Sequence, residues 1–241
     1  MKLSDFKALT FDCYGTLIDW ESGITAALGP LIERLGRPVS GDEALAAFSA
    51  HESEEERRTP DAVYPDILAR VHDAIARDWG LEPDPALATA FGASVPDWPA
   101  FPDSAAALGY LKQHYKLVIL SNVHRAGFAA SNKRLEVDFD AIYTAQDVGS
   151  YKPDPRNFEY LLAHLKQDLG IGRDEILHTA ESLFHDHVPA KTFGLASAWI
   201  HRRAEKGGFG ATQSVGETPE VDFYFTSMAA MAEAHRAEVG S

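Results

Sequence analysis

Short apolar runs recur along the chain, and each is bounded by turn or charged residues. Amphipathic stretches of helical length separate the last four of these runs. Apolar runs without polar alternation indicate strands buried on both faces, as in a parallel sheet covered by helices. The pattern therefore predicts an α/β fold. Its strands are expected at Ala8–Phe11, Leu117–Leu120, Ala141–Ala145, Ile176–Ala180 and Ala196–Ile200.

The interval between the first and second runs is too long for one crossover connection. It holds acidic sequence of helical character, such as Asp42–Ser53 and Tyr64–Trp79. Prolines crowd the return to the sheet, which suits a domain boundary, at Pro83, Pro85, Pro96, Pro99 and Pro102. We therefore expect a helical cap domain of residues 19–98, inserted into a sheet domain of residues 1–18 and 99–241.

Composition and charge exclude some classes of binding partner for this protein. The 241 residues include 36 acids and 22 bases, for a net charge of −14. Such a field repels phosphate groups, so we expect no binding to nucleic acid or to anionic membranes. Met1–Lys7 is charged where a signal peptide needs an apolar run, and no stretch approaches the ~20 apolar residues of a membrane span. A lone cysteine, Cys13, excludes an internal disulfide bond. These features predict a soluble, cytoplasmic protein.

Polar side chains follow the first two apolar runs at the expected strand ends. Asp12 ends the first run, and Gly15 then allows a tight turn of the backbone. Ser121 and Asn122 end the second run, before a helix expected at Arg125–Leu135. A carboxylate at such a strand end lies where open α/β sheets bind ligands. Hydroxyl and amide groups there can cap the helix or help it to hold a small anion.

The next two strand ends carry a cation and two acids. Lys152 follows the third run in a proline-rich turn, and Glu181 and Asp186 flank the exit of the fourth run. Each residue alone would be read as a surface lysine, a helix cap or a turn residue. Together, four consecutive strand ends present a nucleophile, an anion cradle, a cation and an acid. Since no packing requirement explains that coincidence, we expect these residues to form one catalytic site.

These segments resemble the four signature motifs of the haloacid dehalogenase superfamily, in order and spacing: Phe11–Leu17, Leu120–Asn122, Tyr151–Pro153 and Glu181–Asp186. The resemblance implies a Rossmann-like parallel sheet with a helical cap, in which Asp12 is the covalent nucleophile. It also implies that Ser121 and Lys152 hold an anionic substrate, and that Asp186 lies near the hydrolytic water.

Other residues of these motifs are expected to contact the substrate, together with a tryptophan at the junction with the cap: Tyr14, Thr16, Asn122, Glu181 and Trp20. Cys13 points away from its neighbour Asp12 along an extended strand end, and we expect it to pack as a buried thiol. His185 and His187 are not expected to share a metal ion with Asp186, because alternate residues at the start of a helix diverge. We expect them to pack or to give polar support to the loop.

The residue two positions after the nucleophile indicates the reaction. Magnesium-dependent phosphatases of the superfamily have an aspartate there, which protonates the leaving group and activates water. This chain has Tyr14, whose phenol has a reference pKa of ~10 and is poorly suited to that role. Tyr14 instead resembles the branch of type II 2-haloacid dehalogenases, whose aspartate displaces a group from C2 of a small carboxylic acid. We therefore expect a hydrolase of small carboxylic acids that uses no metal and no cofactor.

Three positions depart from the dehalogenase pattern. Leu183 stands where an asparagine is expected, Phe158 where a tyrosine is expected, and Phe48–Glu52 lacks the arginine that receives the halide. A departing halide needs positive or hydrogen-bonding partners, so these changes count against dehalogenation. The chain also resembles the L-azetidine-2-carboxylate hydrolases, in the stretches Phe11–Glu21, Gln146–Pro153, His178–His187 and Gly207–Thr212.

The second resemblance implies that Asp12 opens a strained four-membered ring, from which the protonated nitrogen leaves as a neutral amine. The positive charge of such a substrate would be paired by Asp19, Glu21 or Glu52. We therefore expect hydrolysis of L-azetidine-2-carboxylate, with (S)-2-haloacid dehalogenation as the alternative. A magnesium-dependent phosphatase and a catalytically silent binding protein are weaker alternatives. Apolar faces on the cap helices would allow a homodimer.

Overall fold

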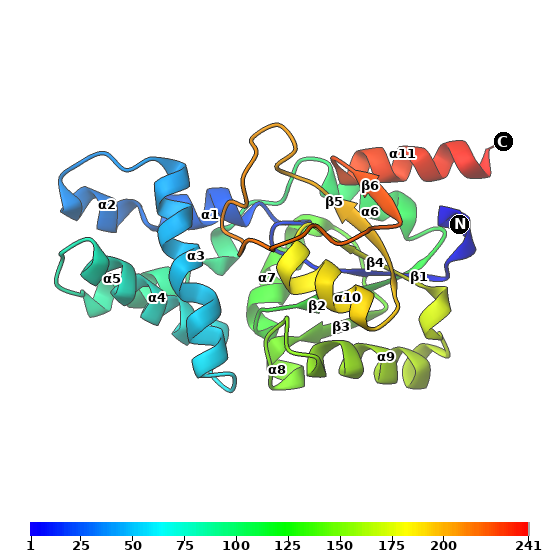
Figure 1. Ribbon diagram of the computed structural model, residues 1–241, viewed down its shortest axis with the longest axis horizontal. Helices are drawn as coiled ribbons and strands as arrows, with labels where there is room; N and C mark the ends of the chain where they lie inside the picture. The colour runs from blue at the N-terminus through cyan, green and yellow to red at the C-terminus, as the bar shows by residue number, and fades with distance from the viewer. Residues whose placement is uncertain (241) are drawn as a thin grey trace.

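The computed structural model describes residues 1–240 and contains a six-stranded, all-parallel sheet in the order β3-β2-β1-β4-β5-β6 (Figure 1). The strands are β1 (Ala8–Phe11), β2 (Lys116–Ser121), β3 (Ala141–Thr144), β4 (Ile176–Ala180), β5 (Ala196–Ile200) and β6 (Phe223–Phe225). The first five coincide with the apolar runs, which confirms the predicted fold class. β6 is short and Tyr224 is 51% exposed, so this edge strand lacks the buried apolar pattern that marks the others.

Both faces of the sheet are covered by helices. Since alternate strand residues point to opposite sides, each strand contributes side chains to both faces. Leu9 and Phe11 of β1 belong to a large hydrophobic cluster that includes residues of α6 (Ser104–Leu111), α7 (Arg125–Leu135) and α11 (Met228–Val239). On the opposite face, Ala8 belongs to a smaller cluster with residues of two further helices, α9 (Arg156–Leu169) and α10 (Val188–Thr192). The short helix α8 (Ala145–Val148) follows β3. Burial on two faces is the physical reason that the strands read as continuous apolar runs.

A group of helices separates β1 from β2: α1 (Trp20–Ala27), α2 (Gly29–Leu35), α3 (Gly41–Arg58), α4 (Tyr64–Asp78) and α5 (Pro85–Gly92). In Figure 1, α2 to α5 lie beside the sheet domain rather than on either face of the sheet. Their buried residues include Leu31, Phe48, Ile67 and Phe91. The chain leaves the sheet domain and returns to it at one place, because Ile18 and Ala100 form an antiparallel β-bridge.

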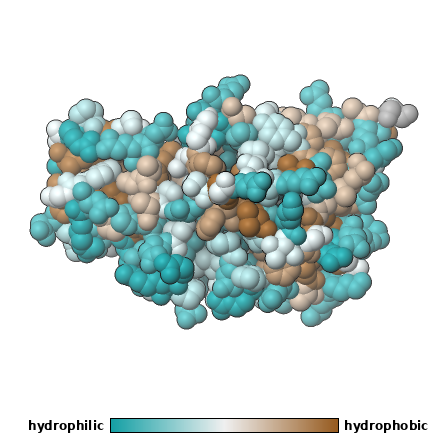
Figure 2. Space-filling view, viewed as in Figure 1, coloured by the Kyte–Doolittle hydropathy of each residue, from teal (hydrophilic) through white to brown (hydrophobic). Residues whose placement is uncertain are grey.

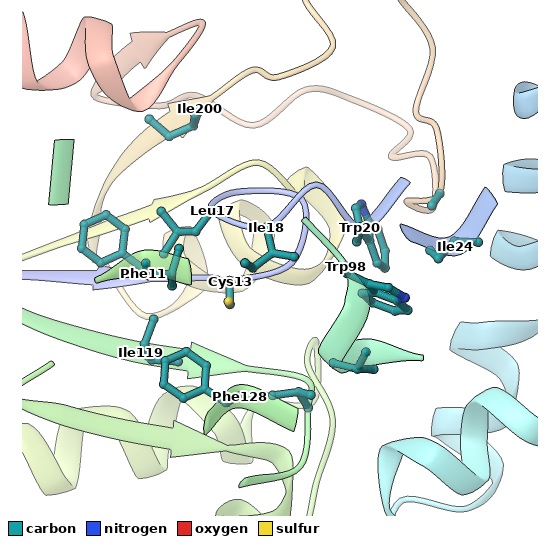
Figure 3. Close-up of a cluster of buried hydrophobic side chains, with 14 of the residues drawn as sticks. Phe11, Cys13, Leu17, Ile18, Trp20, Ile24, Trp98, Ile119, Phe128 and Ile200 are labelled. Atoms are coloured by element: carbon teal, nitrogen blue, oxygen red, sulfur yellow. The ribbon is translucent and has the colours of Figure 1, made fainter. Parts of the chain in front are cut away.

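The junction between the two parts is packed with aromatic side chains. Figure 3 shows Trp20 and Trp98 at the end of the hydrophobic cluster that is nearest the helices, with Phe11 and Cys13 further into the sheet domain. Cys13 is fully buried in this cluster, and burial raises the pKa of its thiol. The thiol is therefore a packing group, as its place beside Asp12 on an extended segment predicts.

On the face shown in Figure 2, hydrophilic residues cover much of the surface, and hydrophobic residues appear between them as separate patches. This distribution accommodates the net charge of −14. Among the helices of residues 1–240, none combines the length and the apolar character that crossing a bilayer requires.

Candidate active site

The carboxyl end of β1 carries Asp12, the expected nucleophile. Its backbone N–H donates to the carbonyl of Thr179 at 3.1 Å, so the pairing of β1 with β4 continues to this residue. Gly15 then adopts φ = 95°, a left-handed conformation that favours glycine. The backbone N–H groups of Leu17 and Ile18 return to the carbonyl of Cys13 at 2.7 and 2.9 Å. This tight turn holds the Asp12 side chain, which is 6% exposed, at the edge of the sheet.

Lys152 joins Asp12 to Asp186 beneath the end of the sheet. Its Nζ donates to Asp12 Oδ1 at 2.9 Å, to Asp186 Oδ1 at 2.7 Å and to the carbonyl of Leu120 at 3.0 Å. Burial would lower the pKa of Lys152, but the two carboxylates raise it above its ordinary value. The side chain is therefore a buried ammonium ion, and these bonds use all the protons it carries.

Thr16 supplies the second partner of the nucleophile. Its hydroxyl donates to Asp12 Oδ2 at 2.8 Å and accepts the backbone N–H of Glu181 at 2.9 Å. The Thr16 hydroxyl thus contacts the nucleophile Asp12, whereas its motif suggests a direct contact with the substrate. Burial raises the pKa of Asp12, and the attraction of Lys152 opposes that rise by stabilising the ionised form that a nucleophile needs.

Asp186 is oriented by a histidine that the sequence analysis does not identify. His178 Nε2 lies 2.9 Å from Asp186 Oδ1, and its Nδ1 lies 2.8 Å from the hydroxyl of Thr10 on β1. Burial alone would raise the pKa of Asp186, yet Lys152 and His178 hold it well below its usual range. A histidine in mid-strand, within an otherwise apolar run, is the sequence signal that could have revealed this contact.

Asn122 ties two loops of the site together. Its Oδ1 accepts the backbone N–H of Lys152 at 2.6 Å, and its Nδ2 donates to the Lys152 carbonyl at 3.0 Å. Capping of the following helix, the role that Ser121 and Asn122 could have as an isolated pair, is not what they do, because α7 has His124 at its N-cap position, without a side-chain cap. Asn122 instead fixes the backbone of the lysine that serves Asp12. Ser121 Oγ is buried and has no hydrogen-bond partner in the described chain.

Tyr14 occupies the position of the phosphatase proton shuttle and is tied elsewhere. Its hydroxyl lies 2.9 Å from Ser131 Oγ on α7, and its ring packs edge-on against Trp98 with centroids 5.6 Å apart. Burial raises the pKa of the Tyr14 phenol well above its ordinary value. The phenol therefore stays protonated, and Tyr14 lines the cavity as an uncharged side chain.

These residues surround a cavity of about 30 Å³ between the end of the sheet and the helices of residues 20–92. It is lined by Asp12, Tyr14, Trp20, Glu52, Tyr64, Ser121, Asn122, Lys152, Ser182, His185 and Asp186. The structure thus brings together most of the residues predicted from the motifs. It adds Tyr64, Ser182 and His185, none of which the sequence predicts to contact a substrate. His185 belongs to a π-helical turn, Leu183–His187, whose geometry places its ring at the cavity.

The helical part contributes buried acids to the site. Glu52 on α3 is 3% exposed, accepts a hydrogen bond from the Tyr64 hydroxyl at 2.7 Å, and has a pKa that burial raises to about 7. Glu56, one turn further along α3, accepts from Asn122 Nδ2 at 3.2 and 3.3 Å, and burial raises its pKa well above the usual range. In the described chain, no arginine lines the cavity.

The other acids named as partners for a substrate cation are occupied. Asp19 caps α1 by accepting the backbone N–H of Ser22 at 3.2 Å. Glu21 forms an ion pair with Arg203 at 2.6 Å. Of the three acids considered from the sequence, Glu52 is therefore the one that faces the cavity.

Glu181 lies outside the cavity that contains Asp12. It lines a small neighbouring pocket with Arg202 and Arg203, and burial raises its pKa to about 8. Its backbone is fixed on both sides, by Thr16 Oγ1 and by the indole N–H of Trp199, which donates to its carbonyl at 2.9 Å. Because Glu181 lines this neighbouring pocket and not the cavity that contains Asp12, its predicted contact with the substrate does not follow from this geometry.

The residues around Asp12 do not fit a magnesium ion of the phosphatase type. Lys152 donates to Oδ1 of both Asp12 and Asp186, and Thr16 donates to Oδ2 of Asp12, while Glu181 lies in the neighbouring pocket. Of the oxygens of Asp12 and Asp186, Oδ2 of Asp186 alone is left without a partner in residues 1–240. Across residues 1–240, no group of three or more acidic, histidine or cysteine side chains is arranged to hold a metal ion.

The sequence of the chain is similar to a known protein family and to known enzymes. Residues 6–178 match the haloacid dehalogenase-like hydrolase family. The (S)-2-haloacid dehalogenase 4A of Burkholderia cepacia is 26% identical over 229 residues, which cover 92% of this chain and 89% of that protein. The (S)-2-haloacid dehalogenase of Xanthobacter autotrophicus is 28% identical over 206 residues, which cover 83% of this chain and 77% of that protein.

The fold agrees with solved structures of similar enzymes. The L-2-haloacid dehalogenase from Xanthobacter autotrophicus superposes with a TM-score of 0.77 at 21% identity, covering 96% of this chain and 98% of that chain. A second structure of that enzyme, with chloropropionic acid covalently bound, superposes with a TM-score of 0.75 at 22% identity and the same coverage. At these identities the likeness establishes the fold.

Proposed function

The chain belongs to the haloacid dehalogenase-like hydrolases, and we propose that it hydrolyses a bond at C2 of a small carboxylic acid through an ester of Asp12. The observation that carries this proposal is the state of the nucleophile. Asp12 is buried beside the Lys152 ammonium and faces a cavity of about 30 Å³, where the neutral phenol of Tyr14 replaces the shuttle acid of a phosphatase. A leaving group that needs no catalytic proton suits this arrangement.

The reaction would proceed in two displacements. In the first, a carboxylate oxygen of Asp12 forms a bond to C2 of the substrate, and the leaving group departs with the bonding electron pair. In the second, water attacks Cγ of the Asp12 ester and releases a 2-hydroxy acid, whose hydroxyl oxygen comes from Asp12. Asp186 Oδ2, which is buried without a partner in the described chain, is the acceptor available for the water proton.

The relatives support halide as the leaving group. Two (S)-2-haloacid dehalogenases match most of this chain, and one such enzyme carries a covalent chloropropionic acid adduct. Halide leaves without a proton, so neutral Tyr14 is no obstacle. We therefore place (S)-2-haloacids first among the substrates, ahead of the azetidine carboxylate favoured by motif resemblance alone.

A second substrate, L-azetidine-2-carboxylate, is supported by Glu52. A halide developing negative charge would gain nothing from a buried acid that lines the same cavity as Asp12, and no arginine there offsets it in residues 1–240. A protonated ring nitrogen, in contrast, would form an ion pair with the Glu52 carboxylate. In this case the C2–N bond breaks, and the nitrogen leaves as a neutral amine that stays attached to the product.

A labelling experiment tests the covalent mechanism. One turnover of excess enzyme in oxygen-18 water, with (S)-2-chloropropionate or L-azetidine-2-carboxylate, is expected to place one labelled oxygen in the peptide that contains Asp12. The matched variant Asp12→Asn should release neither chloride nor an opened ring at a measurable rate. Running the assay with EDTA and with p-nitrophenyl phosphate in parallel separates this chemistry from phosphatase activity.

The outcomes are distinct. Chloride release identifies a dehalogenase, and ring opening identifies the C–N hydrolase. Turnover without label in Asp12, or phosphate release abolished by EDTA, would contradict the proposed mechanism.

A further inference from the structure

The turn that follows β1 contacts the nucleophile through one side chain, that of Thr16. Thr16 is fully buried, and its hydroxyl donates to Asp12 Oδ2 at 2.8 Å. The same oxygen accepts the backbone N–H of Glu181 at 2.9 Å. Since an N–H can only donate and a hydroxyl carries one proton, the Thr16 proton is the one directed to Asp12. The position of the Thr16 backbone therefore decides whether this proton reaches the nucleophile.

A single arginine holds that backbone. Arg202 follows β5, and its side chain is 9% exposed. It reaches from the end of β5 past β4 to the turn after β1, where its Nε and Nη2 both donate to the carbonyl of Thr16, at 3.0 and 2.9 Å. Two donors from one planar guanidinium fix the direction of the carbonyl as well as its position, which a single donor would not do.

The guanidinium of Arg202 is itself anchored on the sheet domain. Its Nη1 donates to both carboxylate oxygens of Asp103, at 2.9 and 3.0 Å, and its Cζ lies 4.0 Å from the centre of the Phe101 ring. Asp103 is the N-cap residue of α6 and also accepts the backbone N–H of Ala229 on α11 at 3.0 Å. The ion pair with Asp103 uses one nitrogen of the guanidinium, and the other two nitrogens serve Thr16.

We infer that Arg202 is a positioning residue for the nucleophile, because it fixes the Thr16 backbone from which the hydroxyl reaches Asp12. Arg202 does not line the cavity that contains Asp12, so it acts through Thr16 and not on a substrate. The inference rests on the proposed function in taking Asp12 as the nucleophile. Burial raises the pKa of Asp12, and the hydrogen bond from Thr16 is one of the contacts that oppose this rise. Loss of Arg202 should therefore change the protonation of Asp12.

The pKa of Asp12 can be measured without turnover. Carbon-13 NMR of protein labelled at the aspartate carboxyl groups follows each titration, and the resonance missing from Asp12→Asn identifies Asp12. Thr16→Val should raise the pKa of Asp12 by about one to two pH units, which corresponds to the loss of one hydrogen bond to a charged group. Arg202→Met should raise it by a similar amount, because the hydroxyl is no longer held on Asp12.

A double variant separates positioning from other effects. When Thr16→Val is already present, adding Arg202→Met should not raise the pKa of Asp12 further, because the path through the hydroxyl is already lost. A direct effect of the arginine charge, or a general loosening of the fold, would raise it a second time. Where the methionine variant does not fold, Arg202→Lys carries the same test, since it keeps a cation beside Asp103 but lacks the planar fork.

The matched control is Arg203→Met, which removes the next arginine of the same segment. Arg203 is 7% exposed, and its guanidinium pairs with acids of α1 and α3. This variant should not raise the pKa of Asp12. An unchanged pKa in Arg202→Met, a second rise in the double variant, or an equal rise in Arg203→Met would overturn the inference. The oxygen-18 label of the wild-type protein judges the ester of Asp12 separately, because it does not depend on this pKa comparison.

Discussion

At the scale of single residues, Lys152 makes Asp12 usable as a nucleophile. The carboxyl groups of Asp12 and Asp186 are both buried, and two such groups without a cation would not both ionise. The ammonium lies 2.9 Å from one and 2.7 Å from the other, and it offsets much of their desolvation. The same contacts give Lys152 a role in stability, because it links the ends of β1, β2 and β4 through Asp12, Leu120 and Asp186.

The variant Lys152→Met should lose both roles. Breaking a buried ion pair by removing one partner costs about 3–5 kcal/mol, so we expect a lower melting temperature. We also expect loss of oxygen-18 label from Asp12 at pH 7, because the pKa of Asp12 rises without its cation. Lys116→Met is the control, since the side chain of Lys116 is 55% exposed and its partner is Asp140. Full labelling in Lys152→Met would show that Asp12 does not need the ammonium.

Glu52 links the site to pH-dependent stability. Its pKa is raised from 4.5 to about 7 in the folded protein, mainly by burial. The folded state therefore binds more protons than the unfolded state between these values. The stability associated with protonated Glu52 is complete below pH 4.5 and is lost as the pH rises through about 7. Since one pKa unit corresponds to about 1.4 kcal/mol, the loss is on the order of 3 kcal/mol.

Replacement of this acid by its neutral isostere should remove that loss. Glu52→Gln is expected to melt higher than wild type at pH 8.5 and nearly equal to it at pH 5, because the amide cannot ionise. Glu54→Gln, on the same helix but with a side chain 53% exposed, should show no such pH dependence. Thermal unfolding at the two pH values checks the prediction. A constant difference between Glu52→Gln and wild type would contradict the raised pKa.

At the scale of elements, helix α1 sets the junction between the sheet domain and the helices. Gly23 on α1 packs directly on Trp98, and a methyl group at this position would lie 2.3 Å from the Trp98 ring. Trp98 in turn packs against the ring of Tyr14, which lines the cavity. The turn after β1, helix α1 and the segment that returns to the sheet domain thus meet at the Trp98 ring.

Gly23→Ala should therefore disturb both stability and the site. Overpacking of a buried contact costs about 1–3 kcal/mol, which would lower the melting temperature by several degrees. Gly29→Ala is the matched control, since Gly29 begins α2 and has open space around it. Urea unfolding of the two variants measures the difference. Equal stability of the two would show that Trp98 can move aside at no cost.

Local sequence patterns were sufficient to predict some of the helices and strands, but not all of them. The helix at Arg125–Leu135 and the strands β1 to β5 follow from local apolar patterns, because each has a face that must be buried. The π-helical turn at Leu183–His187 does not follow, since its hydrogen bonds replace the expected helical start. That difference brings His185 into the cavity, although it was expected to pack or to support the loop.

At the scale of the whole molecule, a segment that follows β5 connects the sheet domain to the helices. Arg203, which is 7% exposed, pairs with Glu21 on α1 at 2.6 Å and with Asp42 on α3 at 3.3 Å. Gln213 donates to the carbonyl of Ser49 on α3 at 2.5 Å. These contacts hold α1 and α3, and hence Trp20 and Glu52, against the end of the sheet.

Arg203→Met should loosen this connection. Removal of the cation leaves the Glu21 carboxylate, which is 14% exposed, without its ionic partner and so weakens the contact between α1 and this segment. We expect faster amide hydrogen exchange in α1 and α3, with little change in β1 and β4. Lys206→Met, at an exposed position of the same segment, serves as the control. Unchanged exchange in α1 and α3 would show that other contacts hold the helices in place.

The sequence by itself determined the strands β1 to β5, the class of fold and the choice of Asp12, Ser121, Lys152 and Asp186 as candidate site residues. These are local properties, because an apolar run must be buried and a polar residue that ends a strand must lie at the edge of the sheet. Tertiary structure alone decided that Lys152 is saturated, that Glu181 faces another pocket, and that Glu52 and His185 line the cavity. Such facts depend on distances between segments far apart in the chain, and no local pattern encodes those distances.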